Sequence, residues 1–556
     1  MAELKTTESL CLPSPCRPLS QQNGKHHDKP TILNLHNDIL WWIFYLNADM
    51  EDEAEEEDAI AAIDTLRYSS QVCSRWRQVI LSFSSLWGQV INLSHLEHHD
   101  WRDEVLRRTG RSLLSVLWVK PDVERLSGDI AAEILKRHWD RIRWLELNFT
   151  YPHIMDDVNI LQFLNIFQRP SEVLEIFRVS FKRGDQTPSP ILSPSNFAVV
   201  SNLAPALRVF FAPNIKFNLA APWLANLRFL ALNGHVSAYD VIQAIPHMPL
   251  LECMRSEHSA IACTGDTLSS LPQITAPSIK QIMLSSYSDM GPYMDFLAHI
   301  KPAAGCCLAF SHSGTTPDAK TLTLANEVLY TYSRCYDFRS AIDISLDLGY
   351  NHFFVEAQIP RKAQFCFQLR PDGSLRCDVV KALFAALPSG GFQELKVLSL
   401  EISEYVFGPA NSRITQFILS VSSVEYLTIS PETLQFLLNF PSDILAASFP
   451  VLHTVEITRY LMKRELSTIR QFLTSRISIG RPIGVLSIPT DLESYTSFDL
   501  RSLERFTGLT VIIQYKGEES EHICGNGRIE ELLIPHGPQW DSDLSDSDSE
   551  SSSEGE

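Results

Sequence analysis

No stretch of the sequence is apolar for long enough to suggest a membrane helix, which needs about 20 consecutive apolar residues. Residues 1–30 also lack the charged segment followed by an apolar one that marks a secretory signal. The eleven cysteines are scattered, and no two form a CxxC pair, so we expect free thiols in a reducing compartment. These absences predict a protein of the cytoplasm, the nucleus or both.

Recognisable catalytic signatures are also missing. The sequence has no GxxxxGK[ST] phosphate loop, no GxGxxG after a strand, no GxSxG elbow and no HExxH helix. Cys73 has no nearby histidine, and we expect a packed thiol rather than a nucleophile. The adjacent Cys306 and Cys307 would point to opposite faces of a strand, and we expect them in the core. We therefore expect no catalytic residue and no cofactor.

One histidine-rich segment, HLEHHD, invites comparison with a metal site. Its side chains would all have to face inward and find a further ligand, whereas histidines on a polar helix are normally exposed. We therefore expect no metal at His95, His98, His99 or Asp100.

The net charge of −19 is concentrated in two tracts. Seven acidic residues lie within residues 51–58 and seven within residues 541–556, which leaves about −5 for the rest of the chain. The body is nearly balanced and lacks the basic footprint of a nucleic-acid-binding protein. We expect the polar leader, residues 1–30, and the acidic Ser/Asp/Glu tail, residues 541–556, to be disordered.

Residues 31–93 contain two amphipathic helical patterns, separated by an acidic insert at residues 49–58 that we expect to loop out. The apolar residues of the first pattern are Leu35, Ile39, Leu40, Ile43 and Phe44. Those of the second pattern, which predicts a single helix, are Val72, Cys73, Trp76, Val79 and Ile80. Short amphipathic helices bury little surface alone, so these two need each other and a partner.

Together the patterns LxxDIxxxIF, VCxxWRxxI and LW resemble the F-box, the small helical module of ubiquitin-ligase substrate receptors. The resemblance covers about a ninth of the chain, and His36 stands where the family usually has proline, so the first turn loses a fixed φ. The matching positions are Leu35, Asp38, Ile39, Leu40, Ile43, Phe44, Val72, Cys73, Trp76, Arg77, Val79, Leu86 and Trp87.

The resemblance implies a function that composition does not. In the F-box family the module docks on a Skp-type adaptor, which connects it to a cullin–RING ligase, and the rest of the chain binds the target protein. The adaptor-binding residues implied for this chain are Leu35, Ile39, Leu40, Ile43, Phe44, Val72, Cys73 and Trp76.

Beyond the module, residues 94–540 carry a repeated unit of the form apolar-x-x-apolar-x-apolar. The alternation fits a strand with one buried face, and many copies lie about 30 residues apart, slightly more than a leucine-rich repeat of about 20–29 residues. Copies start at Leu114, Ile142, Leu174, Leu207, Leu227, Ile279, Leu395, Val424, Leu452, Ile483 and Ile529, with a partial copy at Leu251.

Helical patterns lie between these units, and a further helix is predicted at residues 94–111, with Val105 and Leu106 facing inward and Gly110 ending it. One strand and one helix per unit predict an α/β fold, a curved leucine-rich-repeat-like solenoid with parallel strands. The helical patterns cover residues 129–138, 157–167, 239–245, 431–439, 463–475 and 490–498.

Residues 301–392 break the regularity. CCLAF, IDISLDL, FFVEAQ and FCFQLR are strand-like, and RPDGSL is a turn that could close a hairpin. Either three or four irregular units or an insertion with its own sheet would explain the segment.

Three functions remain open. The favoured one is a non-catalytic substrate receptor that docks a Skp-type adaptor and binds a target through its repeats. The second is a repeat scaffold that never joins a ligase, which His36 and the acidic insert would favour. The third is a hydrolase within residues 301–392, which would need a pocket with converging polar groups.

Overall fold

The computed structural model describes most of the chain between residues 35 and 534. The leader, the tail and all of the acidic insert except Met50 lie outside the described residues. No described helix combines the length and the apolar character needed to cross a bilayer. Between residues 35 and 534, the residues not described are 49, 51–60, 119–127, 151–156, 183–192, 194–196, 233–235, 257–272, 459–464, 491–497 and 516–517.

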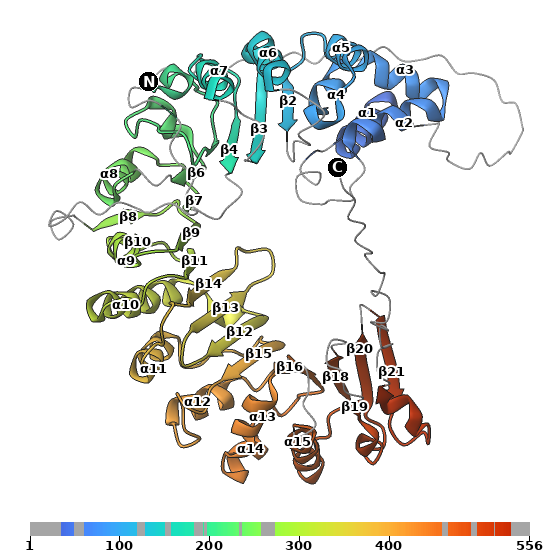
Figure 1. Ribbon diagram of the computed structural model, residues 1–556, viewed down its shortest axis with the longest axis vertical. Coiled ribbons are helices and arrows are strands. Elements are labelled where there is room, and N and C mark those ends of the chain that lie inside the picture. The colour runs from blue at the N-terminus through green and yellow to red at the C-terminus, as the bar shows by residue number, and fades with distance from the viewer. Residues whose placement is uncertain are drawn as a thin grey trace, which may run out of the picture.

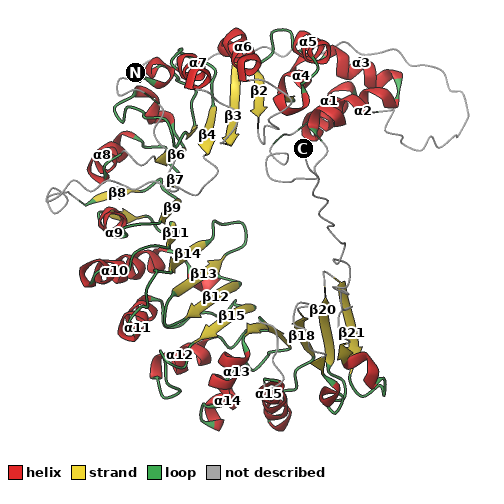
Figure 2. Cartoon of the chain, in the orientation of Figure 1, coloured by secondary structure: helices red, strands yellow, loops and turns green. Residues whose placement is uncertain are grey.

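The chain forms an open arc, with strands along its inner side and helices along its outer side (Figures 1 and 2). Within the described residues, eighteen strands form one continuous sheet. In spatial order they are β1 (Ile91–Asn92), β2 (Leu114–Trp118), β3 (Ile142–Thr150), β4 (Ile176–Lys182), β5 (Val209–Phe211), β6 (Phe229–Leu232), β7 (Cys253–Ser256), β9 (Gln281–Ser286), β11 (Cys307–His312), β14 (Phe365–Leu369), β13 (Phe353–Gln358), β12 (Asp343–Leu348), β15 (Val397–Ile402), β16 (Tyr426–Ile429), β17 (Thr454–Ile457), β18 (Val485–Thr490), β20 (Thr510–Tyr515) and β21 (Glu518–Ile523).

Almost every neighbouring pair in this sheet is parallel. The antiparallel pairs are β14–β13, β13–β12 and β20–β21. Two small separate sheets pair β8 (Ile274–Ala276) with β10 (Ile300–Pro302) and β19 (Phe498–Asp499) with β22 (Leu533–Ile534). The fold class predicted from the repeated unit is therefore confirmed: the chain is a curved, mostly parallel α/β solenoid.

Helices account for the outer side of the arc and for the N-terminal module. The module comprises α1 (Asn37–Asn47), α2 (Ala62–Val72), α3 (Ser74–Ser82) and α4 (Ser84–Gln89). The helices that follow are α5 (His99–Arg108), α6 (Gly128–His138), α7 (Asp157–Phe167), α8 (Ala238–Ala244), α9 (Gly291–Ala298), α10 (Ala319–Cys335), α11 (Cys377–Ala386), α12 (Ser412–Ser420), α13 (Pro431–Leu438), α14 (Ser442–Ala447) and α15 (Leu466–Ser478).

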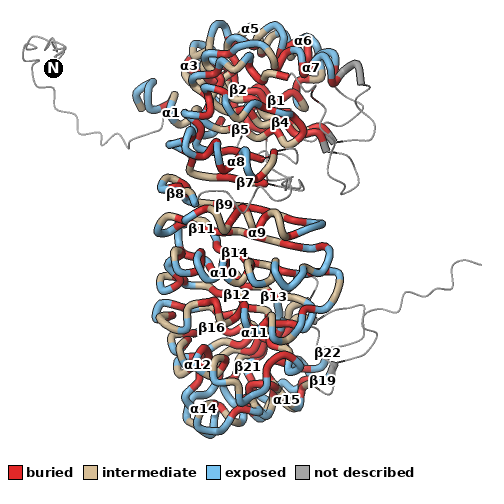
Figure 3. The backbone as a smooth tube through the Cα atoms, turned by 90° about the vertical axis from the view of Figure 1, so that its left-hand side faces the viewer, coloured by how far each residue is buried: buried red, intermediate tan, exposed pale blue. Residues whose placement is uncertain are grey.

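Alternation along each strand places one set of side chains against the outer helices. In β3 the buried residues are Leu145, Leu147 and Phe149, whereas the residues between them are partly exposed on the inner side. Buried positions run through every turn of the arc (Figure 3). The core is therefore one continuous layer between sheet and helices.

Phenylalanine rings connect successive turns of this core. Phe149 and Phe181 are register partners on β3 and β4, and their rings stack with centroids 4.8 Å apart. Phe177 and Phe210 repeat the arrangement on β4 and β5 at 5.6 Å. Each such pair adds about 0.5–1.5 kcal/mol beyond its burial, so identical neighbours help to hold the repeats in register.

Capping side chains start several outer helices. Asp318 Oδ1 accepts a hydrogen bond from the backbone N–H of Thr321 at 2.7 Å, at the start of α10. Asn411 Oδ1 accepts from Arg413 N at 3.1 Å and caps α12. Such caps satisfy backbone donors that a helix leaves unpaired at its first turn.

The predicted single helix over Val72–Ile80 is wrong. Cys73 has an extended backbone (φ −154°, ψ 166°) that ends α2 and starts α3. Its thiol accepts a hydrogen bond from the backbone N–H of Trp76 at 3.5 Å, a local cap that competes with continuing the helix. Cys73 therefore lies at a helix junction rather than on an apolar helical face.

Residues 301–392 contribute to the main sheet and do not form a sheet of their own. The chain passes from β11 through α10 to β12, and then returns as β13 and β14 into the space between β11 and β12. The hairpin predicted at RPDGSL is wrong, because these residues lead from β14 to α11. The connection between β12 and β13 is closed by the hydrogen bond from Gly349 N to His352 O.

The prediction also fails at the C-terminal end. The unit that starts at Ile529 is a 3-10 turn, η11 (Ile529–Leu532), followed by β22, and it adds no strand to the solenoid. The last strands of the main sheet are β20 and β21, and the acidic sequence of β21, EESEHI, does not fit the repeated unit. The helix predicted at residues 490–498 is contradicted at both ends, since Thr490 ends β18 and Phe498 starts β19.

The other predicted helices are confirmed, with shifted ends. Residues 157–167 form α7 with the predicted bounds, and residues 129–138 lie within α6. The helix predicted at residues 94–111 begins only at His99, and Val105 is buried as expected. Gly110 follows it with a φ of +51°, as a residue that ends a helix does.

Candidate functional site

The N-terminal module builds its own small core around α1. Phe44 on α1 is buried, and its ring meets that of Trp76 on α3 edge-on, with centroids 5.1 Å apart. Arg75 on α3 donates hydrogen bonds to Leu35 O and, at 3.1 Å, to Asn37 Oδ1. His36 caps α1 through its Nδ1, which accepts from Asp38 N at 3.4 Å. His36 therefore starts the helix by accepting a capping hydrogen bond. The proline that the F-box family usually has at this position would start the helix by fixing φ.

The opposite side of α1 exposes large apolar side chains. Ile39 is 48% exposed, Trp42 55% and Leu46 67%. They are three and four residues apart, so they share one face of the helix, which we name the α1 stripe. α2 exposes a further pair, Tyr68 and Val72. Clustered exposed apolar residues mark interaction surfaces, whereas isolated ones carry no such meaning.

The eight residues expected to bind the adaptor fall into three groups. Leu40 and Phe44 are buried in the core of the module, so they hold α1 in place and cannot touch another chain directly. The exposed residues are Ile39 and Val72. The half-buried residues are Leu35, Ile43, Cys73 and Trp76.

The module is joined tightly to the first turn of the solenoid. β1, which follows α4, pairs in parallel with β2. Gly88 on α4 lies so close to the next turn that a Cβ atom there would be 2.4 Å from Leu113 O. Trp87 beside it is fully buried, donates from Nε1 to Ile80 O at 3.0 Å and carries the Arg108 guanidinium over its ring at 4.5 Å. Module and solenoid therefore share one core.

The inner, concave face of the solenoid changes character along the arc. Trp144 and Arg178 lie on its first half, where Arg178 Nη1 contacts Glu146 Oε2 at 3.1 Å. The second half is acidic, with Asp343, Glu356, Glu401 and Glu456 on β12, β13, β15 and β17. Desolvation by burial raises the pKa of Asp343 and of Glu356.

A hollow of about 610 Å³ opens at the ends of β12, β15 and β16, above the start of α13. None of its described lining residues is a lysine or an arginine. Its charged and aromatic lining residues are Asp347, Tyr350, His352, Glu401, Glu404, Tyr405, Glu432 and Glu465. This arrangement suits a cationic or hydrogen-bonding partner better than an anionic one.

The described cysteines are all free. Cys306 and Cys307 are both buried, as expected, and burial raises the pKa of Cys306 to about 12. A thiol with a raised pKa stays protonated and is a poor nucleophile. In HLEHHD, His95, His98, His99 and Asp100 are all exposed, and although His99 Nε2 lies 3.1 Å from Asp100 Oδ1, no three of them come together as ligands.

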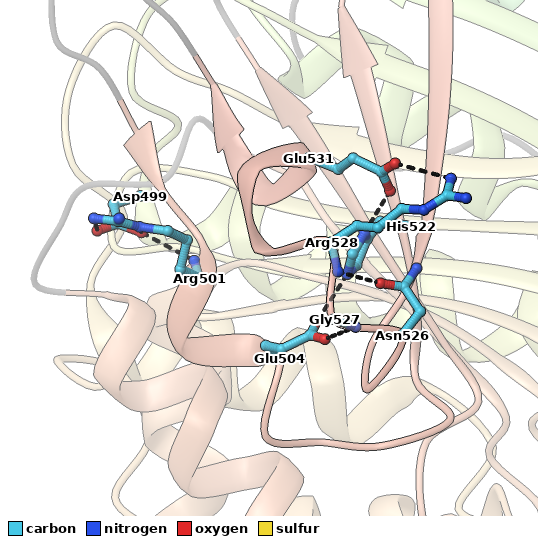
Figure 4. Close-up of polar contacts among 8 residues, drawn as sticks. All are labelled: Asp499, Arg501, Glu504, His522, Asn526, Gly527, Arg528 and Glu531. Atoms are coloured by element: carbon cyan, nitrogen blue, oxygen red, sulfur yellow. Dashed lines mark hydrogen bonds and ion pairs between the residues drawn. The ribbon is translucent and has the colours of Figure 1, made fainter.

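A charged cluster lies at the C-terminal end of the main sheet, around His522 on β21 (Figure 4). His522 is buried, and its ring nitrogens contact Glu504 Oε2 at 2.8 Å and Glu531 Oε2 at 2.9 Å. Burial alone would lower the pKa of His522, but the hydrogen bonds to both carboxylates outweigh it and raise the pKa. The buried Cys524 lies nearby on the same face of the chain.

Sequence reasoning missed Trp42 and Leu46, because the F-box-like pattern directed attention to the residues that match it. Their spacing from Ile39 was the signal that could have found them. It also missed Glu504, His522 and Cys524. For this second group, the sequence signal was the two-residue spacing of His522 and Cys524, because residues two apart on a strand face the same side.

Comparison with known proteins adds little to this description. No family model matches the chain, and no curated protein matches it. The leucine-rich repeat-containing protein LegL7 from Legionella pneumophila is 14% identical over 53% of this chain and 84% of its own, with a TM-score of 0.25. A protein from Bacteroides fragilis is 10% identical over 64% of this chain and 72% of its own, with a TM-score of 0.20. Superpositions this loose carry no argument about function. By its own strand pairing, the chain is a leucine-rich-repeat-like α/β solenoid.

Proposed function

We propose that the chain is the substrate-recognition subunit of a Skp–cullin–F-box type ubiquitin ligase. The N-terminal module docks the Skp-type adaptor, and the concave face of the solenoid holds the target protein. The chain does no covalent chemistry and supplies proximity, because a bound target raises the effective concentration of its lysines near the ligase.

The α1 stripe carries the proposal. The module buries Leu40 and Phe44 in its own core and leaves Ile39, Trp42 and Leu46 in solvent. The half-buried Trp41 extends this surface, and its ring meets that of Trp42 edge-on with centroids 5.0 Å apart. A docking partner would supply the apolar cover that these side chains lack.

The target surface is proposed on the acidic second half of the concave face and its hollow. Carboxylates from several strands face the inner side there, so we expect targets to present lysine and arginine side chains. The variant Glu404→Lys/Glu432→Lys reverses two exposed charges at the hollow and should lose target proteins while keeping the adaptor. Loss of both together would instead indicate a folding defect.

A direct binding measurement tests the docking step. The full-length chain should bind a purified Skp-type adaptor, and Ile39→Asp/Leu46→Asp should weaken binding by about 30-fold or more, since loss of even one buried interface anchor costs at least about 2 kcal/mol. Both side chains are exposed, so the fold should survive. Leu203→Asp, at a solenoid position with 51% exposure, is the matched control. Equal binding by both variants would refute docking through α1.

A scaffold outside any ligase is the second candidate. It is supported by the way α4 and β1 continue into the solenoid, because end units that cover a repeat core are needed for solubility. Such a cap explains the burial of Trp87 but not the exposure of the α1 stripe. A chain that is fully folded yet binds no adaptor would support this candidate.

A further inference from the structure

At the C-terminal end of the arc, three side chains of different chemistry converge. Glu504 follows the turn η10 (Arg501–Leu503), His522 lies on β21, and Cys524 follows that strand. One carboxylate oxygen, one ring nitrogen and the sulfur all lie within 4.8 Å of one another. We propose that Glu504, His522 and Cys524 bind a divalent transition-metal ion, with zinc as the best fit.

The donor set is the reason for choosing zinc. Thiolate, imidazole and carboxylate are its usual protein ligands, at about 2.0–2.3 Å, which places ligand atoms about 3.3–3.6 Å apart in a tetrahedron. His522 Nε2 and Glu504 Oε2 are 2.8 Å apart and would move slightly apart, whereas any wider pair, all within 4.8 Å, would close by about 1 Å at most. Side-chain rotation suffices for movements of this size, and the fourth position is left for water.

The neighbouring hydrogen bonds orient the ligands. Glu531 Oε2 contacts His522 Nδ1 at 2.9 Å, so Nε2, which contacts Glu504 Oε2, is the nitrogen left for the metal (Figure 4). Gly527 N donates to Glu504 Oε1 at 2.9 Å, which leaves Oε2 for the centre. Metal-binding histidines usually donate their other N–H to a carboxylate or carbonyl in this way.

Burial suits a site that excludes most solvent but remains open on one side. His522 is 2% exposed and Cys524 1%, whereas the Glu504 side chain is 15% exposed and offers the way in. On binding, the thiol proton of Cys524 and the Nε2 proton of His522 pass to solvent. The ion would then tie η10 to β21 and stabilise the last turn of the solenoid, at the far end of the arc from the α1 stripe (Figure 1).

Cobalt(II) titration of the full-length chain, freed of metal with a chelator, tests the proposal. We expect one equivalent to produce a thiolate-to-cobalt charge-transfer band and the intense visible bands of tetrahedral coordination, and zinc to abolish both. Glu531→Gln, which removes only the orienting carboxylate, should weaken affinity by about 10–100-fold. A titration that gives neither band overturns the proposal without any variant.

Site-specific variants exclude the other thiols, three of which lie outside the described residues. Cys524→Ser should abolish the charge-transfer band. Cys253→Ser should leave it intact, although burial raises the pKa of Cys253, like that of Cys524, to about 11. A band that survives Cys524→Ser would place the metal elsewhere. Far-ultraviolet circular dichroism confirms that each variant is folded. If Cys524→Ser is not, Glu504→Gln takes its place and should weaken cobalt binding, because it removes one of the three ligands.

Discussion

The helical module and the solenoid treat their apolar residues in opposite ways. The solenoid turns bury the alternate apolar residues of their strands against the next turn, as Phe149 does against Phe181, although apolar residues elsewhere, such as Leu203, are exposed. On α1 the module buries only Leu40 and Phe44 fully, and Ile39, Trp42 and Leu46 stay in water. Successive repeats therefore bury the apolar faces of one another. A helical module of this size packs against its neighbouring repeat on one side and leaves apolar residues on the other side for a partner.

The largest expected effect comes from the residue that joins the two regions. Trp87→Ala should lower the free energy of unfolding by about 3–5 kcal/mol, because it empties a fully buried position and leaves Ile80 O without its donor. Thermal unfolding followed by circular dichroism measures this. A loss below about 1 kcal/mol would show that module and solenoid do not share a core.

Gly88 tests how closely α4 packs against the first turn of the solenoid. Gly88→Ala should cost about 1–3 kcal/mol, because the new methyl group would lie 2.4 Å from the backbone oxygen of Leu113 and must push α4 away. Gly390→Ala is the matched control, since nothing lies within 4 Å of a Cβ atom there. If the two variants melt at the same temperature, α4 does not pack against the first turn as described.

A surface charge cluster on α5 should matter less. Hydrogen bonds from Arg107 and Arg108 lower the pKa of Glu104 to about 2 from an unfolded value of 4.5. The stabilisation is therefore complete above pH 4.5 and is lost as the pH falls towards 2. Because the side chain is 33% exposed, Glu104→Gln should cost less than about 1 kcal/mol at neutral pH, and its difference from wild type should shrink in acid. A difference that grew in acid would contradict this sign.

The smallest expected effect on stability lies on the α1 stripe itself. Ile39→Ala should change the free energy of unfolding by no more than about 0.5 kcal/mol, as is usual for exposed positions. Leu40→Ala, one residue away and fully buried, should cost about 2–5 kcal/mol. Equal losses for the two, measured by urea unfolding, would mean that Ile39 is covered by its own chain.

Periodicity predicted the parts of the fold that repeat. The apolar units that correspond to β3 and to β15, β16, β17 and β18 form parallel strands, as predicted. Their alternation of apolar and polar residues specifies which face of each strand is buried. The order of β14, β13 and β12 could not be predicted, since a strand pattern does not say which neighbour it pairs with. The helix break at Cys73 was also hidden, because one residue with an extended backbone leaves the apolar spacing almost unchanged.

The candidate sites were less predictable than the fold. The F-box-like pattern names residues by identity, and identity does not distinguish Leu40, which faces the core, from Ile39, which faces water. The cluster at Glu504 and His522 joins residues from two elements that meet only after the chain has turned back on itself. Sites formed by such distant residues require the tertiary structure.

Binding of the full-length chain to a purified Skp-type adaptor, measured for wild type and for Ile39→Asp/Leu46→Asp, tests the central claim most directly. We expect a stable complex with wild type and a loss of affinity of about 30-fold or more with the variant, while both chains melt at the same temperature. Undiminished binding by the variant, or no binding by a correctly folded wild-type chain, would contradict it.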